Sequence, residues 1–264
     1  MADETLIRLG VFGGLLVLFG LWEYLAPRRT RRVSPAARWR TNLALVVIDS
    51  VTLRLVALVV PLLAVGAAVD AGVLGWGLLN QFVLPGWLEL LLALLILDFA
   101  IWAQHLVTHK VPLFWRFHRV HHADRDMDVT TGVRFHPVEI AASMLLKVAL
   151  VYGLGPSPLA VLVFEVLLNG TALFNHANLA LPGRVDAALR LVLVTPDMHR
   201  VHHSALRQEH DSNYGFSLSL WDRLFHTYRA SPAQGHDGMT VGLQWQADQP
   251  QRLGWSLLLP FRRR

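Results

Sequence analysis

The sequence of 264 residues contains no cysteine, which excludes disulfide bonds, thiolate-bound zinc and iron–sulfur clusters. A metal ion bound by this chain must therefore be held by nitrogen and oxygen ligands. Charged residues are also scarce, because they make up 16% of the chain against about 25% in an average soluble domain. With a hydrophobic content of 53%, this composition excludes a disordered chain and disfavours an ordinary soluble protein.

The positive charge of the chain is concentrated beside its apolar runs. The formal net charge is +5, and six arginines lie between residues 28 and 40, directly after the first apolar run. Such clustering is typical of a membrane protein and disfavours a nucleic-acid partner, which needs a basic face on a soluble fold. By the positive-inside rule, we expect this loop on the cytoplasmic side and the N-terminus on the other side.

Long apolar runs predict helices that cross a membrane. Each of three runs supplies the roughly 20 residues that a span needs, and they cover about residues 6–26, 43–69 and 78–107. The first run follows Asp3 and Glu4 rather than basic residues, and no small-residue cleavage site follows it. We therefore expect a retained membrane helix there rather than a signal peptide.

A fourth apolar region, residues 138–175, is interrupted by glycines and prolines at 153–158. This pattern predicts two spans or one re-entrant hairpin, and both return to the side of the membrane on which they began. The predicted fold is an all-α polytopic integral membrane protein with about four to five transmembrane or re-entrant helices. Its histidine-rich segments are expected to form a helical cap on the cytoplasmic face.

The histidines of this chain are regularly spaced. Eight of the thirteen form three clusters, which are HxxxH at His105 and His109, and HxxHH both at His118, His121 and His122 and at His199, His202 and His203. On a helix, residues three and four positions apart share one face with Cβ atoms about 5–6 Å apart, so two imidazoles can bind one metal ion. A tetrahedral zinc site closes with four ligands, so eight histidines predict two metal ions with four or five ligands each. Imidazole ligands suit zinc, copper, iron or nickel.

Motifs that are absent narrow the chemistry further. The sequence has no H-E-x-x-H, which argues against a zincin-type protease, and no E-x-x-H, which argues against a ferritin-like di-iron bundle. A histidine-rich membrane protein that binds or transports metal is the alternative, and it would place histidines near the bilayer midplane. A haem-binding electron carrier is a third hypothesis, and it needs paired histidines on facing helices. The clusters here follow the helix ends and lie in polar stretches, which favours an enzyme.

The three clusters resemble the histidine boxes of the fatty acid hydroxylase and sterol desaturase superfamily. Further matching segments occur in the same order, at residues 98–99, 113–116, 134–137, 175–178, 195–196, 213–215 and 221–225. The resemblance extends over about residues 94–228, half of the chain. With the apolar runs, we therefore expect three parts: N-terminal transmembrane helices and a basic loop at 1–93, a catalytic domain at 94–230, and a tail at 231–264. The apolar segment and basic end of the tail are consistent with a place at the membrane interface.

Members of this superfamily are membrane-bound, non-haem di-iron oxygenases that use O2 and two electrons to hydroxylate, desaturate or oxidatively cleave lipids. The resemblance therefore implies two iron ions, with zinc as a substitute that purified protein can take up. It implies nine iron ligands, namely His105, His109, His118, His121, His122, His176, His199, His202 and His203. His136 also matches a family histidine, as a tenth candidate ligand or as a histidine that begins the helix before Pro137.

Four polar residues are expected to orient the ligand histidines through hydrogen bonds: Asp98, Asp124, Asn213 and Asp222. A metal-bound imidazole usually donates its second N–H to a carboxylate or a carbonyl. Asp98 lies two helical turns before His105 on the same face, although a salt bridge to an arginine such as Arg54 explains it nearly as well. His210 and His236 have no motif around them and are expected to face solvent. His226 stands where many relatives carry glycine and need not bind metal.

The resemblance also implies the partners of the reaction. The substrate is expected to be a lipid that arrives from the bilayer, and fatty acids, sterols, hopanoids, carotenoids and ether lipids all remain open. Since the chain has no cysteine for a cluster and no visible flavin fold, the electrons are expected from an external donor. A reductase, a ferredoxin or a cytochrome b5-like protein would serve.

Overall fold

Proline starts most of the long helices of this chain. The computed structural model describes residues 2–60, 63–245 and 249–262, and within them the regular structure is helical. Helices α2 (Pro35–Val59), α5 (Pro112–His122), α6 (Pro137–Leu154), α7 (Pro158–His176) and α9 (Pro196–His202) all begin with proline in the first turn. Proline is favoured there because its fixed φ suits a helix and its missing N–H would have no partner in any case.

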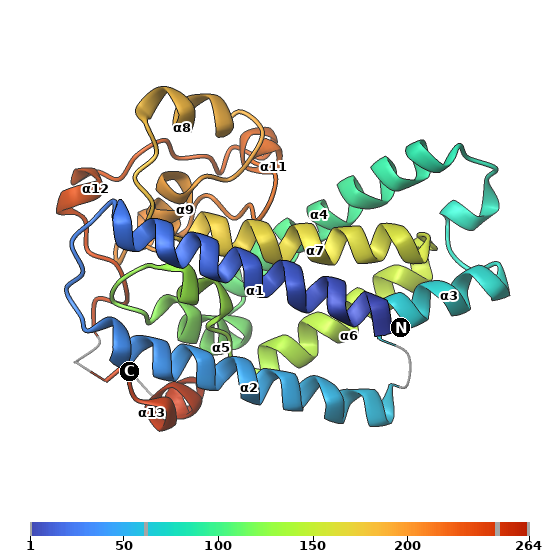
Figure 1. Ribbon diagram of the computed structural model, residues 1–264, viewed down its shortest axis with the longest axis horizontal. Helices are drawn as coiled ribbons and strands as arrows, with labels where there is room; N and C mark the ends of the chain where they lie inside the picture. The colour runs from blue at the N-terminus through green and yellow to red at the C-terminus, as the bar shows by residue number, and fades with distance from the viewer. Residues whose placement is uncertain (1, 61–62, 246–248, 263–264) are drawn as a thin grey trace.

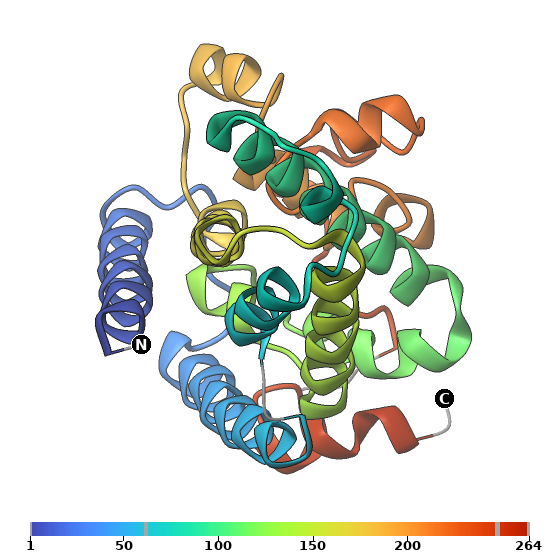
Figure 2. The ribbon, with the colours of Figure 1, turned by 90° about the vertical axis from the view of Figure 1, so that its right-hand side faces the viewer.

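Five segments of the chain are long and apolar enough to cross a membrane. They centre on α1 (Ala2–Leu25), α2, α4 (Gly86–Lys110), α6 and α7. Figure 1 shows these helices side by side, and the view along the bundle in Figure 2 places α7 between α1 and α4. The chain is therefore a multi-pass membrane protein, and the predicted all-α fold with four to five spans is confirmed.

The second apolar run is not one helix. Helix α2 ends at Val59, Pro61 lies outside the described residues, and a separate short helix α3 (Ala64–Leu74) follows. With eleven residues α3 rises about 16 Å, too little to cross the roughly 30 Å of hydrocarbon. It packs against α6 and α7, and η1 (Leu79–Gln81) leads on to α4.

The predicted break at residues 153–158 is a turn, and it separates two helices, α6 and α7. Gly155 ends α6 in the left-handed conformation with φ +66°, which glycine adopts without steric cost. Gly77 approaches the same turn so closely that a Cβ there would lie 2.2 Å from the Gly155 amide nitrogen. The two glycines therefore allow the segment after α3 to pack directly on the turn.

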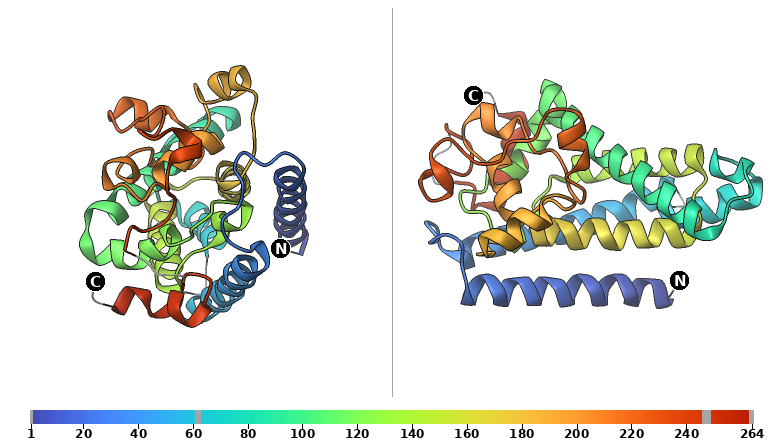
Figure 3. Two further views of the ribbon diagram at one scale, coloured as in Figure 1. Left: turned by 90° about the vertical axis from the view of Figure 1, so that its left-hand side faces the viewer. Right: turned by 90° about the horizontal axis from the view of Figure 1, so that it is seen from above.

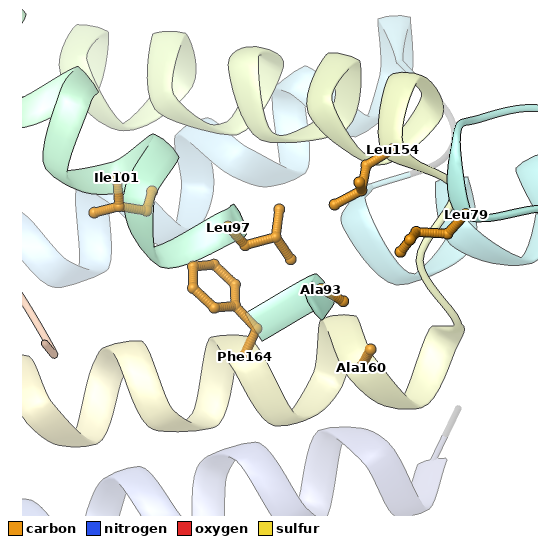
Figure 4. Packing of buried hydrophobic residues seen from close by; sticks show 7 residues of the cluster. All are labelled: Leu79, Ala93, Leu97, Ile101, Leu154, Ala160 and Phe164. Carbon is orange, nitrogen blue, oxygen red and sulfur yellow. The ribbon is translucent and has the colours of Figure 1, made fainter. Parts of the chain in front are cut away.

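Small residues let the spans approach one another. Figure 4 shows Leu97 of α4 and Phe164 of α7 facing each other, with Ala93 and Ala160 beside them. In a bilayer the lipid tails are as apolar as leucine, so this packing is driven by close van der Waals contact rather than by exclusion of water. Alanine provides the short distance between helices that such contact requires.

The histidine-rich segments gather at one end of the bundle (Figures 1 and 3). The short elements there are α5, η2 (Val129–Val133), α8 (Gly183–Leu189), α9, α10 (Arg207–His210), α11 (Leu220–Leu224) and α12 (Gly235–Gly238). The arginine-rich loop lies at this end too, because the Arg28 amide donates to the Asn178 carbonyl at 2.9 Å. Arginines and histidines therefore share one side, as predicted, and the N-terminus lies at the opposite end. That this side is cytoplasmic stays a prediction.

The C-terminal tail packs onto the capped end. Helix α13 (Leu253–Leu258) and η3 (Leu259–Phe261) bury Trp255 and Leu259 against α2 and α5. Arg263 and Arg264, the end of the predicted interfacial tail, lie outside the described residues. The division of the chain at residues 93 and 230 stays a prediction.

Candidate metal centre

Four helices bring the nine predicted ligand histidines together. α4 carries His105 and His109, α5 carries three histidines, and α7 ends at His176. The short helix α9 carries the last cluster, with His203 directly after its end. All nine side chains are buried, with 5% exposure or less. Such burial of nine imidazoles at the end of a membrane bundle needs a compensating interaction.

The nine histidines separate into two groups. Within each group, one ring nitrogen of every member lies within 4.8 Å of those of all the others. The first group contains His105, His109, His118, His122 and His202, and the second contains His121, His176, His199 and His203. The groups are in contact, because the rings of His122 and His203 stack at 4.6 Å. The sizes of the two groups, five and four histidines, match the numbers of ligands that the sequence predicted for two metal ions.

The pentapeptide His-Arg-Val-His-His occurs twice, and the two copies contribute to opposite groups: the outer histidines of one copy and the fourth residue of the other belong to the same group. In residues 118–122 the outer histidines join the first group and the fourth residue, His121, joins the second. In residues 199–203 the outer histidines join the second group and His202 joins the first. Positions i and i+4 share a helix face while i+3 points to its edge, so each short helix serves both groups.

Hydrogen bonds fix the direction of the ring lone pairs in the second group. His176 Nδ1 lies 2.7 Å from the Ala172 carbonyl oxygen, and His121 Nδ1 lies 3.2 Å from that of Arg134. A carbonyl can only accept, so both Nδ1 atoms carry the proton and, in the neutral rings, both Nε2 atoms carry a lone pair. Burial and the neighbouring imidazoles hold the pKa of His121 well below its ordinary value, so the neutral form is present.

Three imidazole nitrogens converge on a single lone pair in this group. His176 Nε2 lies 3.1 Å from Nε2 of His121, 3.1 Å from that of His199 and 3.2 Å from that of His203. One lone pair cannot bond all three, and the His121 nitrogen has no proton to offer. Nitrogens bound to one metal at about 2.1 Å lie about 3.0–3.4 Å apart, so these distances fit a metal site.

The first group contains buried nitrogens that lack a hydrogen-bond partner among the described residues, although His109 Nδ1 lies 3.6 Å from a carboxylate oxygen of Asp211. They include both ring nitrogens of His109 and the Nε2 atoms of His122 and His202. His202 donates from Nδ1 to the Ser212 carbonyl at 2.7 Å, so its neutral ring turns a lone pair away from that loop. An unsatisfied buried polar atom costs about 1–3 kcal/mol, which a metal ion would offset at several atoms together. The donor set, imidazole without thiolate, suits iron, zinc, copper or nickel.

Two of the predicted orienting residues act through backbone carbonyls. Asp222 accepts from the Tyr214 amide at 2.8 Å, and the Tyr214 carbonyl accepts from His105 Nδ1 at 2.6 Å. Asn213, at φ +52°, donates to the Met198 carbonyl at 2.8 Å and adjoins the residue whose carbonyl accepts from His202. Both side chains therefore hold the loop whose carbonyls contact His105 and His202, rather than bonding to an imidazole themselves.

Asp98 and Asp124 have other partners than the sequence suggested. Asp98 accepts from the Trp221 indole at 2.8 Å and from the Leu218 amide at 3.4 Å, and neither His105 nor Arg54 is among its described contacts. Asp124 binds Arg38 of α2 at 2.6 Å. Burial opposes the charge of Asp124, but Arg38 outweighs it and lowers the pKa of the carboxyl to about 2. These two aspartates fix the elements that surround the histidines.

Glu139 is an orienting residue that the sequence reasoning missed. Its carboxylate lies 2.6 Å from Nδ1 of His118, at the first turn of α6. The available signal was an acidic residue three positions after His136. An acidic residue at a helix start is common without any site, because it is stabilised by the helix dipole.

The remaining histidines lie outside the two groups. His136 caps α6, because its Nδ1 accepts from the Val138 amide at 3.2 Å, which matches the helix-start interpretation. The expectation that His210 faces solvent is wrong: it is half-buried and stacks on Trp115 at 5.3 Å, next to His109. His236 is half-buried too, 3.7 Å from a carboxylate oxygen of Asp197. His226 is exposed with φ +57°, a conformation that favours glycine.

Replacing Glu139 with alanine is expected to lower the metal affinity of the first group by about 10–100-fold, because His118 loses the acceptor that orients it. The second group is expected to keep its affinity. Competition with a chelator measures the metal affinity of each group. Glu139→Gln, which retains an acceptor oxygen, should fall between, and Glu89→Ala, at the far end of the bundle beside Ser157, should change neither. An unchanged affinity in Glu139→Ala would remove this role.

Cavities connect the first group with the apolar surface of the bundle. A cavity of about 300 Å³ reaches His105 and His118 from between the spans. A wider groove of about 860 Å³, lined almost entirely by apolar side chains of α4, α5 and α6, adjoins it. The two spaces share four lining residues: Gln104, Thr108, Glu139 and Ser143. The cavity beside the first group and the apolar groove therefore lie next to each other, with these four residues in the walls of both.

Comparisons with known proteins agree with this geometry. A model of the fatty acid hydroxylase family matches residues 90–227, which include all nine grouped histidines. Ornithine lipid hydroxylase OlsE of Rhizobium tropici is 31% identical over 145 residues, or 54% of this chain and 43% of that protein. Alkylglycerol monooxygenase of Homo sapiens is 32% identical over 152 residues, or 56% of this chain and 32% of that protein.

A third relative, also a hydroxylase by name, has a lower sequence identity to this chain. Cholesterol 25-hydroxylase of Rattus norvegicus is 28% identical over 145 residues, or 54% of this chain and 48% of that protein. This chain thus spans less than half the length of each of these three relatives. No solved structure gave a significant match. Since the family match covers more than half of the sequence, the chain belongs to the fatty acid hydroxylase family.

Proposed function

We propose that this protein is a membrane-bound oxygenase that uses O2 and two electrons to hydroxylate a lipid, with desaturation or oxidative cleavage as variants of the same chemistry. One observation carries the proposal: two all-histidine groups adjoin each other at one end of the bundle, and the first of them borders a cavity between the spans that lies next to an apolar groove. The nine grouped histidines would hold two iron ions, and zinc would fit the same nitrogens in purified protein.

The iron pair supplies the activation of O2 and the redox chemistry when it is bound. The work of the chain is to prepare the ligands. The Tyr214, Ser212 and Ala172 carbonyls fix the protonated nitrogen of His105, His202 and His176. Each lone pair is thereby directed away from its backbone partner before a metal arrives, so little reorganisation is needed.

The cavity walls position the substrate. Ile101, Leu168 and Phe216 line the cavity that ends at His105 and His118, and they would hold an apolar chain with one carbon beside the first group. The same apolar walls exclude bulk water from the reacting carbon. The relatives act on ornithine lipid, alkylglycerol and cholesterol, and these are all membrane lipids. This common property supports a lipid that enters sideways from the bilayer.

An external electron donor would dock beside the first group. A pocket of about 670 Å³ there is lined by Lys110, Arg116, Arg207 and Trp115, and it reaches His109. Such a basic surface suits an acidic partner protein. The arginine-rich loop at the same end supports a cytoplasmic location for this face.

The metal-transport hypothesis fits the histidine positions less well. A transporter places its ligands near the bilayer midplane between broken helices. Here His105, His109 and His176 lie in the last turns of the long helices α4 and α7.

The test is incorporation of oxygen from labelled O2. Purified protein is loaded with iron in nanodiscs, reduced with ferredoxin, ferredoxin reductase and NADPH, and supplied with ¹⁸O2 and a panel of ornithine lipid, alkylglycerol, sterol and fatty acid. We expect one lipid class to gain one ¹⁸O atom, and the His121→Ala, His202→Ala double variant to gain none. Iron-loaded protein that oxidises no lipid but carries iron into liposomes would instead favour transport.

A further inference from the structure

Three charged side chains meet inside the membrane-spanning part of the bundle. Glu165 of α7 is 5% exposed, and its carboxylate binds Lys147 of α6 at 2.7 Å and the guanidinium of Arg8 of α1. All three residues lie within candidate spans. Ionisable residues at such depth are costly to place in lipid and mark functional sites more often than surface charges do.

The three charges line the same cavity as His105 and His118. Glu165 precedes His176 by eleven residues, and Lys147 follows Glu139, the partner of His118, by eight. The charges therefore lie about 16 Å along α7 from His176 and about 12 Å along α6 from Glu139. The cavity therefore has the metal groups at one end and an ion cluster at the other.

The ion cluster leaves donors available to a ligand. An ammonium group has three N–H donors, and Glu165 is the one acceptor that Lys147 contacts among the described residues. Arg8 is also paired with Glu4, which does not line the cavity, so this end of the lining carries two cations and one anion. Glu139, the second carboxylate of the lining, lies at the other end and contacts His118. Gln104, Ser143 and Asn169 add neutral polar groups to the wall. Salt bridges that only held three helices together would need neither a cavity beside them nor unused N–H donors.

We propose that Lys147, together with Arg8 and Glu165, binds the polar end of the lipid substrate. This inference rests on the proposed function and specifies its substrate class: an amphiphile with an oxygen acceptor, a carboxylate or a hydroxyl, at one end. The carbon presented to the histidines lies about 12–16 Å from that end. The ion cluster thus selects a position on the lipid that is remote from its polar group.

Binding tests the proposal without catalysis. Zinc-loaded protein in nanodiscs is titrated with tritiated palmitate, hexadecanol or hexadecane, and saturable binding is measured by scintillation proximity. We expect palmitate or hexadecanol to bind at least about tenfold more tightly than hexadecane. Lys147→Met should lower the affinity for palmitate to the level of hexadecane. Lys147→Arg should retain most of the palmitate affinity, and Lys110→Met, outside this cavity, should retain all of it.

A second variant distinguishes a binding site from a structural tie. Glu165→Gln removes the only anion of the ion cluster, so palmitate should bind several-fold more tightly to it than to the native protein, whereas loss of a structural salt bridge alone would not improve binding. Equal affinities for palmitate and hexadecane, or palmitate affinities unchanged in both Lys147→Met and Glu165→Gln, would overturn the proposal. Iron content and ¹⁸O incorporation report on the proposed function separately, since the binding assay needs neither.

Discussion

His176→Ala is expected to leave the protein with one metal ion per chain instead of two. His176 is the residue on which the second group converges, because three other Nε2 atoms lie within 3.2 Å of its own. The first group contains five histidines from three other helical segments and keeps all of them. Activity is expected to fall by more than about 100-fold, because under the proposed function the chemistry would require both metal ions.

His109→Ala, the converse variant, is expected to remove the metal ion of the first group. His109→Ala takes one ligand from the first group and none from the second. His210→Ala is the control, because His210 stacks near His109 but belongs to neither group of four or five. Metal analysis of the three variants should give one, one and two ions. Loss of both ions in His176→Ala, or of neither, would show that the histidines do not form two separate sites.

Arg38→Met is expected to destabilise the folded protein by about 3–5 kcal/mol, because it leaves buried carboxylates without their cation. Arg38 is 2% exposed and joins Asp124 and Asp128 of the segment that follows α5. That segment leads from His122 towards η2, so the histidines should also be displaced. Thermal unfolding in detergent measures the change.

The exposed Arg40 on the same helix provides a matched control, and Arg40→Met should change stability by less than about 0.5 kcal/mol. The acid dependence follows from the same pair. The pKa of Asp124 falls from its ordinary 3.8 to about 2 on folding, so its contribution is complete above pH 4 and is lost as the pH falls towards 2. A change below 1 kcal/mol in Arg38→Met would contradict this assignment.

The spacing of the histidines was sufficient to predict two groups of histidines but not the composition of each group. HxxxH and HxxHH place imidazoles on one face of a helix, which is a local property of the chain. Which helix meets which is tertiary information, so spacing did not reveal that His121 and His202 cross to the opposite groups. His176 has no neighbouring histidine, and only the family resemblance indicated it.

The orienting contacts were less predictable than the ligands. Spacing placed Asp98 on the same helix face as His105. The carboxylate instead accepts a hydrogen bond from the indole of Trp221, more than one hundred residues away in the sequence. His118 is oriented by Glu139 on a different helix, and His105 by a backbone carbonyl of a loop, which carries no signal in the residue type. The apolar runs predicted the spans because length and hydropathy are local, whereas the break after Val59 was not evident.

The most direct test of a di-iron centre is the iron content of the native protein after anaerobic reconstitution, measured by mass spectrometry of the metal per chain after removal of loosely bound ions. We expect about two iron ions per chain and no haem absorption band, as two groups of four and five histidines require. One iron ion per chain, or none in a folded protein, would contradict the assignment of both groups as metal sites.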